Sequence, residues 1–288
     1  MSEEKWDLKP LQTELLFILK QVVEVCRKHG IRYYSSGGTM LGAVRHQGFI
    51  PWDDDIDIEM PHEDFARFLD HLNELPPHLK LGRGGKDGPV YSAKIYDTRE
   101  GICQRLSKET NLDIKEQPFI DIFMIEGLPE HSSDIREWYR TRKIWRLVQI
   151  YRFPDTCTGH GLNGFVKLVV GRLFGFFLDW KFPKTETNED MMRQLDIIAA
   201  QHPFDESFTV CEPCFLKDRI KRMVPRFFYE PAREVPFEDG TIRIPNRAED
   251  MCQISFGDYM RLPPPEFRIP EHLMHKCGRM FDKTVIVA

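Results

Sequence analysis

The sequence predicts an α+β protein, with a mixed β-sheet flanked by helices. In the first 130 residues, stretches with apolar residues at helical spacing alternate with short apolar or aromatic stretches, and Gly or Pro separates them. From about residue 131 the pattern becomes mainly helical, and residues 208–265 return to short strands and turns. We therefore expect a core at 1–130, a helical insertion at 131–207, and a short β-rich C-terminal section at 208–288 that packs back on the core.

Length and composition exclude several classes of protein. A chain of 288 residues fits two domains or one large domain, and 12% aromatic residues indicate a real hydrophobic core. The net charge of -5 argues against a strongly basic nucleic-acid binder, so we expect no nucleic-acid partner. The acidic first ten residues do not resemble a signal peptide, and no apolar run of about 18 residues lacks a charge. Seven scattered cysteines do not suggest a disulfide framework, so we expect a cytoplasmic protein.

The elements of the core follow from apolar spacing and from the residues that interrupt it. Residues 8–29 have the spacing of a helix, and Gly30 stands where a helix C-terminus favours glycine. We expect strands at 31–34, at 53–58 and within 90–96 and 114–125. Further helices are expected at 39–45 and, after Pro61, at 62–75.

The most informative segment is the acidic run DDDIDI at residues 53–58. In a strand, alternate residues share a face, so Asp53, Asp55 and Asp57 would line one side while Ile56 and Ile58 enter the core. Carboxylates this close repel each other unless a cation lies between them. A hard divalent ion such as Mg²⁺ fits, because it takes oxygen ligands and commonly joins protein carboxylates to substrate phosphates.

Two other interpretations of the acidic run remain open. The run alone is equally compatible with a solvated strand edge or turn. A calcium loop of the EF-hand type fits less well, because the positions that require glycine and glutamate hold Ile58 and Asp64.

A glycine pair precedes the acidic run. Gly37 and Gly38 follow an expected strand and precede an expected helix, where backbone N–H groups can approach a phosphate closely. Ser36 and Thr39 add hydroxyl donors. An isolated glycine pair is most often an ordinary turn, but the combination of strand, Gly-Gly, helix and Asp-x-Asp strand is far more specific. It would hold a phosphate at one end and the metal of that phosphate at the other.

This combination resembles the nucleotidyltransferase superfamily. The longer string GGTMLGAVRHQGFIPWDDDID, residues 37–57, resembles the LicD family, which includes the fukutin-related proteins, and the resemblance extends over residues 10–128. It implies a nucleotidyltransferase-like sheet and a catalytic role for residues 1–130. FIDIF at 119–123 resembles a later strand of the family, which implies that Asp121 joins Asp55 and Asp57 as catalytic metal ligands. FGDYM at 256–260 resembles a C-terminal motif, although Phe256 replaces its usual tyrosine.

The family resemblance also implies an activity. We expect a phosphotransferase that uses one or two Mg²⁺ ions, or Mn²⁺, to move phosphocholine or a related phospho-alcohol from a CDP-linked donor to a glycan or lipid-linked glycan, with release of CMP. Two alternatives stay open: a true nucleotidyltransferase that transfers an NMP and releases pyrophosphate, and a non-catalytic nucleotide-binding protein on the same fold.

Cations and aromatic residues near these motifs are candidate substrate contacts. Lys94 lies in an expected strand where the family carries a similar basic residue, and it would meet the diphosphate as a point charge. Arg45 and His46 lie between the glycines and the aspartates, and Asp53 would complete the metal shell or orient His46. Trp52 would stack on a base or choline headgroup, or anchor the core beside the acidic run; the second role is favoured.

Two further features could indicate a zinc site and a membrane contact, but in each case another explanation is favoured. Cys157, His160, Cys211 and Cys214 are ligand types for a structural zinc ion, although unrelated reduced cysteines are the better explanation. Residues 165–180 are aromatic and apolar, and would rest on the inner face of a membrane or, as we favour, pack within the helical region or form a dimer contact.

Overall fold

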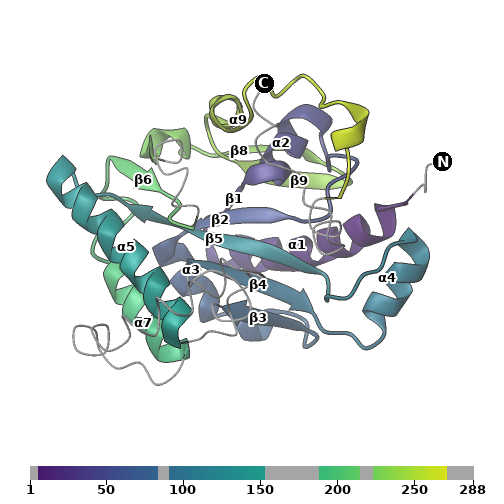
Figure 1. Ribbon diagram of the computed structural model, residues 1–288, viewed down its shortest axis with the longest axis horizontal. Helices are drawn as coiled ribbons and strands as arrows, with labels where there is room; N and C mark the ends of the chain where they lie inside the picture. Colours follow the sequence, from purple (N-terminus) through teal and green to yellow (C-terminus); the bar gives the residue numbers. More distant parts are fainter. Residues whose placement is uncertain (1–5, 84–90, 153–187, 215–222, 271–288) are drawn as a thin grey trace.

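The computed structural model describes residues 6–83, 91–152, 188–214 and 223–270, and it has an α+β architecture (Figure 1). A seven-stranded sheet has the strand order β1-β2-β5-β4-β3, and β6 extends it by pairing with β5 and β7. Its strands are β1 (Tyr34–Ser35), β2 (Asp57–Pro61), β3 (Leu79–Arg83), β4 (Ser92–Asp97), β5 (Phe119–Gly127), β6 (Thr209–Cys211) and β7 (Met223–Pro225). A separate hairpin joins β8 (Arg233–Phe237) to β9 (Gly240–Ile244). The helices are α1 (Lys9–His29), α2 (Gly37–His46), α3 (His62–Leu69), α4 (Ile102–Thr110), α5 (Ser132–Arg152), α7 (Asn188–Ala199) and α9 (Ala248–Phe256).

The centre of the sheet mixes strand directions, which confirms the predicted fold class. β2 and β5 run parallel, whereas β4 pairs with β5 in the antiparallel sense. The register places Asp57 opposite Asp121, and Asp121 opposite Lys94, so three polar residues form one row across three strands. Because side chains alternate between faces, the residues on either side of this row, such as Ile58, Ile95 and Ile122, turn to the other face.

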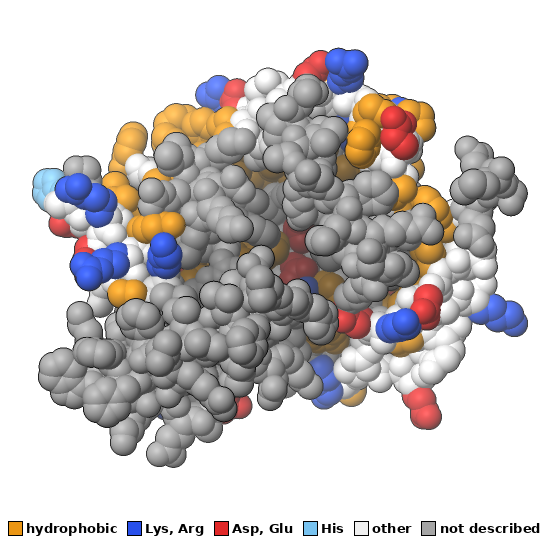
Figure 2. All heavy atoms as spheres, in the orientation of Figure 1, with side chains coloured by type: hydrophobic (Ala, Val, Ile, Leu, Met, Phe, Trp, Pro, Cys, Tyr) orange, Lys and Arg blue, Asp and Glu red, His pale blue; other side chains and the backbone are white. Residues whose placement is uncertain are grey.

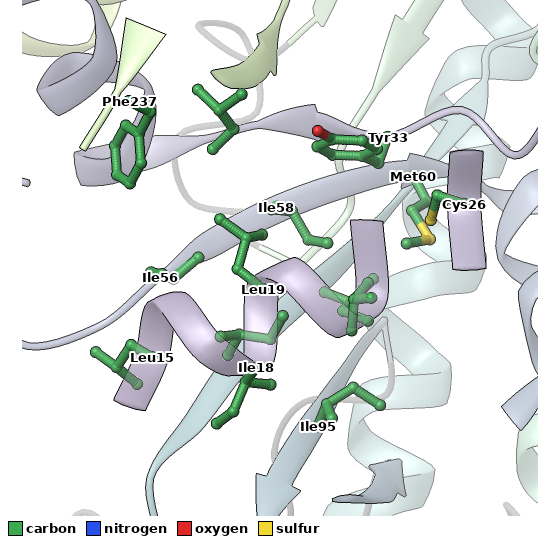
Figure 3. Close-up of a cluster of buried hydrophobic side chains, with 14 of the residues drawn as sticks. Leu15, Ile18, Leu19, Cys26, Tyr33, Ile56, Ile58, Met60, Ile95 and Phe237 are labelled. Carbon is green, nitrogen blue, oxygen red and sulfur yellow. The ribbon is translucent and has the colours of Figure 1, made fainter. Parts of the chain in front are cut away.

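Helix α1 covers that other face of the sheet. It presents Leu15, Ile18 and Leu19 toward the strands, where they meet the apolar side chains of the main core such as Ile58 and Ile95 (Figure 3). Each fully buried side chain of this kind stabilises the fold by about 1.5–3 kcal/mol, so the packing of α1 offsets part of the cost of burying charges on the opposite face. The helix ends as predicted at Gly30, which adopts the left-handed conformation with φ of 60°.

The acidic run does not form a strand over its whole length, contrary to the prediction for residues 53–58. β2 begins only at Asp57, and residues 53–56 precede it, although the Ile56 carbonyl already accepts a hydrogen bond from Asp121 N–H of β5 at 2.8 Å. The backbone groups of Asp53 form hydrogen bonds outside the sheet. Its N–H donates to the Ile50 carbonyl at 2.9 Å, and its carbonyl accepts from Gln12 Nε2 at 3.0 Å. A turn and a side chain of α1 thus satisfy groups that would otherwise need a neighbouring strand.

Other predicted elements are present with shifted bounds. The helix expected at 39–45 is α2, which already begins at Gly37, and the strand expected at 31–34 is the two-residue β1. The helix expected at 62–75 divides into α3 and a 3-10 turn at Leu72–Glu74.

The helical region and the C-terminal section both contact the core. Asp196 of α7 accepts hydrogen bonds from His62 at 2.9 Å and from Arg83 at 2.9 Å. The C-terminal section contains the expected strands and also the helix α9, which contacts α2. The limits predicted for the three regions stay predictions. Among the described residues, no helix combines the length and the apolar character needed to cross a bilayer.

Gly42 allows α2 to pack closely on the loop that leads to the acidic run. A β-carbon at this position would lie 2.5 Å from the Gly48 carbonyl oxygen and 3.2 Å from Ile50 N. Since both are backbone atoms, we expect Gly42→Ala to lower the free energy of unfolding by about 1–3 kcal/mol. Gly240→Ala is the control, because nothing lies within 4 Å of its added carbon. Equal stability of the two variants in urea denaturation would contradict this role.

Candidate active site

Three carboxylates converge at the polar row of the sheet. Asp57 and Asp121 lie opposite each other on the parallel strands β2 and β5, and Asp55 lies two residues before the start of β2. One oxygen from each residue lies within 4.8 Å of the others, and Asp55 and Asp121 are buried. Acidic side chains are visible at depth in a hollow near the middle of one face of the molecule (Figure 2). This convergence is the arrangement that a divalent cation requires.

The electrostatics of the group are unfavourable without a cation. Burial raises the pKa of Asp57 well above its ordinary value, and the neighbouring charges of Asp55, Asp121 and Asp53 raise it further. Lys94 opposes this effect, because its ammonium group lies 2.8 Å from Asp121 Oδ2. The same ammonium group lies 3.4 Å from the centre of the Phe119 ring, which adds a cation–π contact. The structure thus brings Lys94 into the group of carboxylates.

The glycine pair lies directly against two of the aspartates. A β-carbon on Gly37 would lie 2.6 Å from Asp57 Oδ2, and one on Gly38 would lie 2.8 Å from Asp53 Oδ2. Gly37 also has a φ of +50°, which favours glycine. Because Gly37 and Gly38 have no side chains, the carboxylates of Asp57 and Asp53 can lie close to them. The predicted contact of the two glycines with phosphate stays a prediction.

The residues that flank the glycines hold the backbone of Asp57. The Asp57 N–H group donates to Thr39 Oγ1 at 2.9 Å, and Ser36 N–H donates to the Asp57 carbonyl at 3.0 Å. The Ser36 hydroxyl donates to Glu59 Oε1 at 2.5 Å. Ser36 and Thr39, predicted as substrate contacts, therefore fix the position of a metal-ligand candidate.

Arg45 and His46 make their contacts at the far end of α2. Arg45 donates to the Tyr259 carbonyl at 2.5 Å and to His46 Nε2 at 2.9 Å, so it joins α2 to the segment that resembles the C-terminal family motif. Burial lowers the pKa of both side chains. The His46 ring lies edge-on to Trp52, which is partly buried against the main core as the favoured interpretation expects. Neither contact of Arg45 is with the three clustered carboxylates.

Two residues of this region, Glu59 and Tyr229, were not predicted from the sequence. Glu59 is buried on β2, two residues after Asp57, and accepts hydrogen bonds from Ser36 and from the Tyr229 hydroxyl. The alternation of the acidic run continues through position 59 and was a usable signal. No local pattern points to Tyr229, which lies 170 residues further along the chain.

The remaining predicted metal site is only partly described. Cys211 and Cys214 are buried in two different apolar clusters, whereas Cys157 and His160 lie outside the described residues. The apolar stretch 165–180 also lies outside them. The zinc and membrane predictions therefore stay predictions.

Another group of ligand-type side chains lies at the C-terminal end of α1. His29, His71 and Glu74 approach each other there, but Glu74 is 2.6 Å from Lys28 and 2.8 Å from His29. This group is an ion-pair cluster that complements the end of the helix.

Comparisons with known proteins agree with the geometry. Residues 30–154 match the family described as LicD/FKTN/FKRP, nucleotidyltransferase domain. The chain is 28% identical over 277 residues to the lipopolysaccharide cholinephosphotransferase LicD of Haemophilus influenzae, which covers 94% of this chain and 97% of that protein. It is 40% identical over 64 residues to the human ribitol 5-phosphate transferase FKRP, covering 22% of this chain and 13% of FKRP. The mouse FKRP is 47% identical over 64 residues, with the same coverage of 22% and 13%.

The raised pKa of Asp57 predicts a stability gain when its charge is removed. Without metal, Asp57 binds its proton more tightly in the folded protein than in the unfolded chain, where its pKa is about 3.8. The free energy of unfolding therefore falls as pH rises from about 3.8 through the raised pKa of the folded state. We therefore expect metal-free Asp57→Asn to melt at a higher temperature than the wild type at neutral pH, with the difference shrinking toward acid pH. Mg²⁺ should raise the melting temperature of the wild type but not of the variant. Thermal denaturation in EDTA checks this, and a variant less stable at every pH would contradict it.

Proposed function

Because residues 30–154 belong to the LicD/FKTN/FKRP nucleotidyltransferase family, we propose that the protein is a metal-dependent phosphotransferase. It would move phosphocholine, or a related phospho-alcohol, from a CDP-linked donor to a hydroxyl group of a glycan and release CMP. The observation that carries this proposal is the convergence of Asp55, Asp57 and Asp121 within 4.8 Å. The named activities of the bacterial and mammalian relatives, both transfers of a phospho-alcohol, support the choice of reaction.

The residues at the site fit a hard divalent cation. All three side chains offer carboxylate oxygens, which Mg²⁺ and Mn²⁺ prefer. Burial and, after it, the neighbouring carboxylates raise the pKa of Asp57, and a cation would favour its charged form. Asp55, Asp57 and Asp121 would hold one or two ions. A bound ion would neutralise charge on the diphosphate and on the departing CMP.

The other residues of the site would position the donor and its metal ligands. Lys94 would supply a fixed positive charge beside Asp121, available to a phosphate oxygen. Ser36 and Thr39 keep Asp57 at its place in β2, and the glycine pair keeps space open around two carboxylates. Such transfers depend chiefly on alignment and charge compensation, so a rigid row of polar residues on a packed sheet suits the reaction.

In the proposed reaction, an acceptor hydroxyl oxygen attacks the phosphorus that carries the alcohol. The new P–O bond forms as the bond to the CMP oxygen breaks, and the hydroxyl proton leaves to a base. The acceptor would be a glycan or a lipid-linked glycan, consistent with the lipopolysaccharide named for the bacterial relative.

Two alternatives would use the same residues differently. A true nucleotidyltransferase would use a nucleoside triphosphate instead. The acceptor would attack its α-phosphorus, and pyrophosphate would leave. A non-catalytic nucleotide-binding protein would bind the donor without turnover. Retention of all three carboxylates in one cluster favours catalysis over simple binding.

A donor screen tests the proposal. The purified protein is incubated with Mg²⁺, a glycan acceptor and a panel of CDP-alcohols that includes CDP-choline and CDP-ribitol, and the released nucleotide is identified by mass spectrometry. We expect acceptor-dependent release of CMP. Pyrophosphate release from a nucleoside triphosphate would favour the first alternative, and binding without any turnover would favour the second.

A pair of variants tests the metal ligands. We expect Asp55→Asn combined with Asp57→Asn to reduce turnover at least about 100-fold, because charge compensation by the metal supplies several kcal/mol. Asp113→Asn is the control, an exposed aspartate shortly before β5 that pairs with Lys115. A double variant that turns over at the wild-type rate would show that these carboxylates do not hold the metal.

A further inference from the structure

A buried hydrogen-bond network connects the C-terminal section to the glycine turn of the site. Its centre is Glu59, whose side chain is 3% exposed. One carboxylate oxygen of Glu59 accepts from the Tyr229 hydroxyl at 2.8 Å, and the other accepts from the Ser36 hydroxyl at 2.5 Å. A buried carboxylate is costly unless donors satisfy it, so both hydroxyls are held firmly in place.

Ser36 transmits this constraint to the candidate metal ligand. Its N–H group donates to the Asp57 carbonyl at 3.0 Å, and its own carbonyl accepts from Met40 N–H at 2.9 Å, in the first turn of α2. The next residue, Gly37, is the one whose missing side chain leaves room for Asp57 Oδ2. A displacement of Ser36 would therefore alter two things at once: the hydrogen bond to the Asp57 carbonyl, and the room that Gly37 leaves for the Asp57 carboxylate.

Tyr229 is itself held by residues of the core, the helical region and the C-terminal section. It is 2% exposed, and its ring lies edge-on to Tyr34 at 5.1 Å and to Phe204 at 5.9 Å between centroids. Its carbonyl accepts from Asn246 N–H at 3.1 Å, which ties it to the segment after β9. The hydroxyl is therefore presented to Glu59 by a rigid support.

From these contacts we infer that Tyr229 and Glu59 are positioning residues for the metal site, so that the C-terminal section is part of the catalytic unit. The inference rests on the proposed function, since it assigns these residues to the metal that the function requires. Tyr229 lies outside residues 30–154 that match the family, so this chain completes its site with a residue from beyond the matched domain. Burial of Glu59 serves to hold the glycine turn against β2.

The structure offers a matched pair of variants to test this. Tyr34 belongs to the same apolar cluster as Tyr229, is fully buried, and donates its hydroxyl to Glu230 Oε1 at 2.5 Å rather than to Glu59. Tyr229→Phe and Tyr34→Phe therefore each remove one buried hydroxyl bond and keep the ring. Only the first change removes a hydrogen bond of the network that reaches Ser36, because Tyr34→Phe keeps both the ring beside Tyr229 and the strand pairing with Glu59.

The measurement is the dissociation constant for Mn²⁺ by titration calorimetry on the full chain, with melting temperature as the readout of a purely structural role. We expect Tyr229→Phe to weaken Mn²⁺ binding about fivefold, below the 10–100-fold typical of groups bonded directly to metal ligands. Tyr34→Phe should lower the melting temperature similarly and leave Mn²⁺ binding within about twofold of wild type. Glu59→Gln should weaken binding as Tyr229→Phe does, with no added effect in the double variant.

Equal Mn²⁺ affinity of the Tyr229 and Tyr34 variants would overturn the inference. Its failure is distinguishable from failure of the proposed function. A wild-type protein that binds Mn²⁺ but transfers no phospho-alcohol would overturn the function and leave the positioning role open to the same comparison of variants. A wild-type protein that binds no Mn²⁺ would overturn both.

Discussion

The close approach of like charges is the feature of the site that the surrounding structure has to maintain. Asp57 and Asp121 face each other because two parallel strands are paired in one register, and Asp55 joins them from the segment before β2. Left to themselves, such carboxylates would separate or take up protons. They stay together because the backbone that carries them is locked on one side by α1 and its core and on the other by the glycine turn.

One face of the sheet carries the apolar core, and the other face carries the candidate site. On one face, Ile56 and Ile58 are fully buried beneath α1, and this packing contributes to the stability that keeps the carboxylates close together on the other face. On the polar face, Lys94 pairs with Asp121 and also lies over the Phe119 ring, and Ser36 donates both to the Asp57 carbonyl and to Glu59. These two residues are thus each held by more than one contact.

The matches to known proteins differ in how much of the chain they cover. Similarity to the bacterial cholinephosphotransferase extends over nearly the whole chain, including the C-terminal section, whereas similarity to the mammalian ribitol 5-phosphate transferases is confined to 64 residues. The segment that matches the family, residues 30–154, contains all three clustered carboxylates. Under the proposed function, the residues that select the alcohol and the acceptor would lie in the parts of the chain where the relatives differ.

Local sequence patterns were enough to predict which residue types stand at the site and which of them share a face. Alternation predicted that Ile56 and Ile58 would be buried while Asp55 and Asp57 are directed to the other side, and the chain order of glycine pair, helix and acidic run predicted α2 and β2. The three-dimensional structure was needed to show that Asp121, 64 residues after Asp57, lies directly opposite it. It also decided that β2 begins at Asp57, that Arg45 contacts Tyr259, and that Tyr229 reaches Glu59. The physical reason is that alternation is a property of the local backbone, whereas strand register and the partners of long side chains are set by packing between segments far apart in the chain.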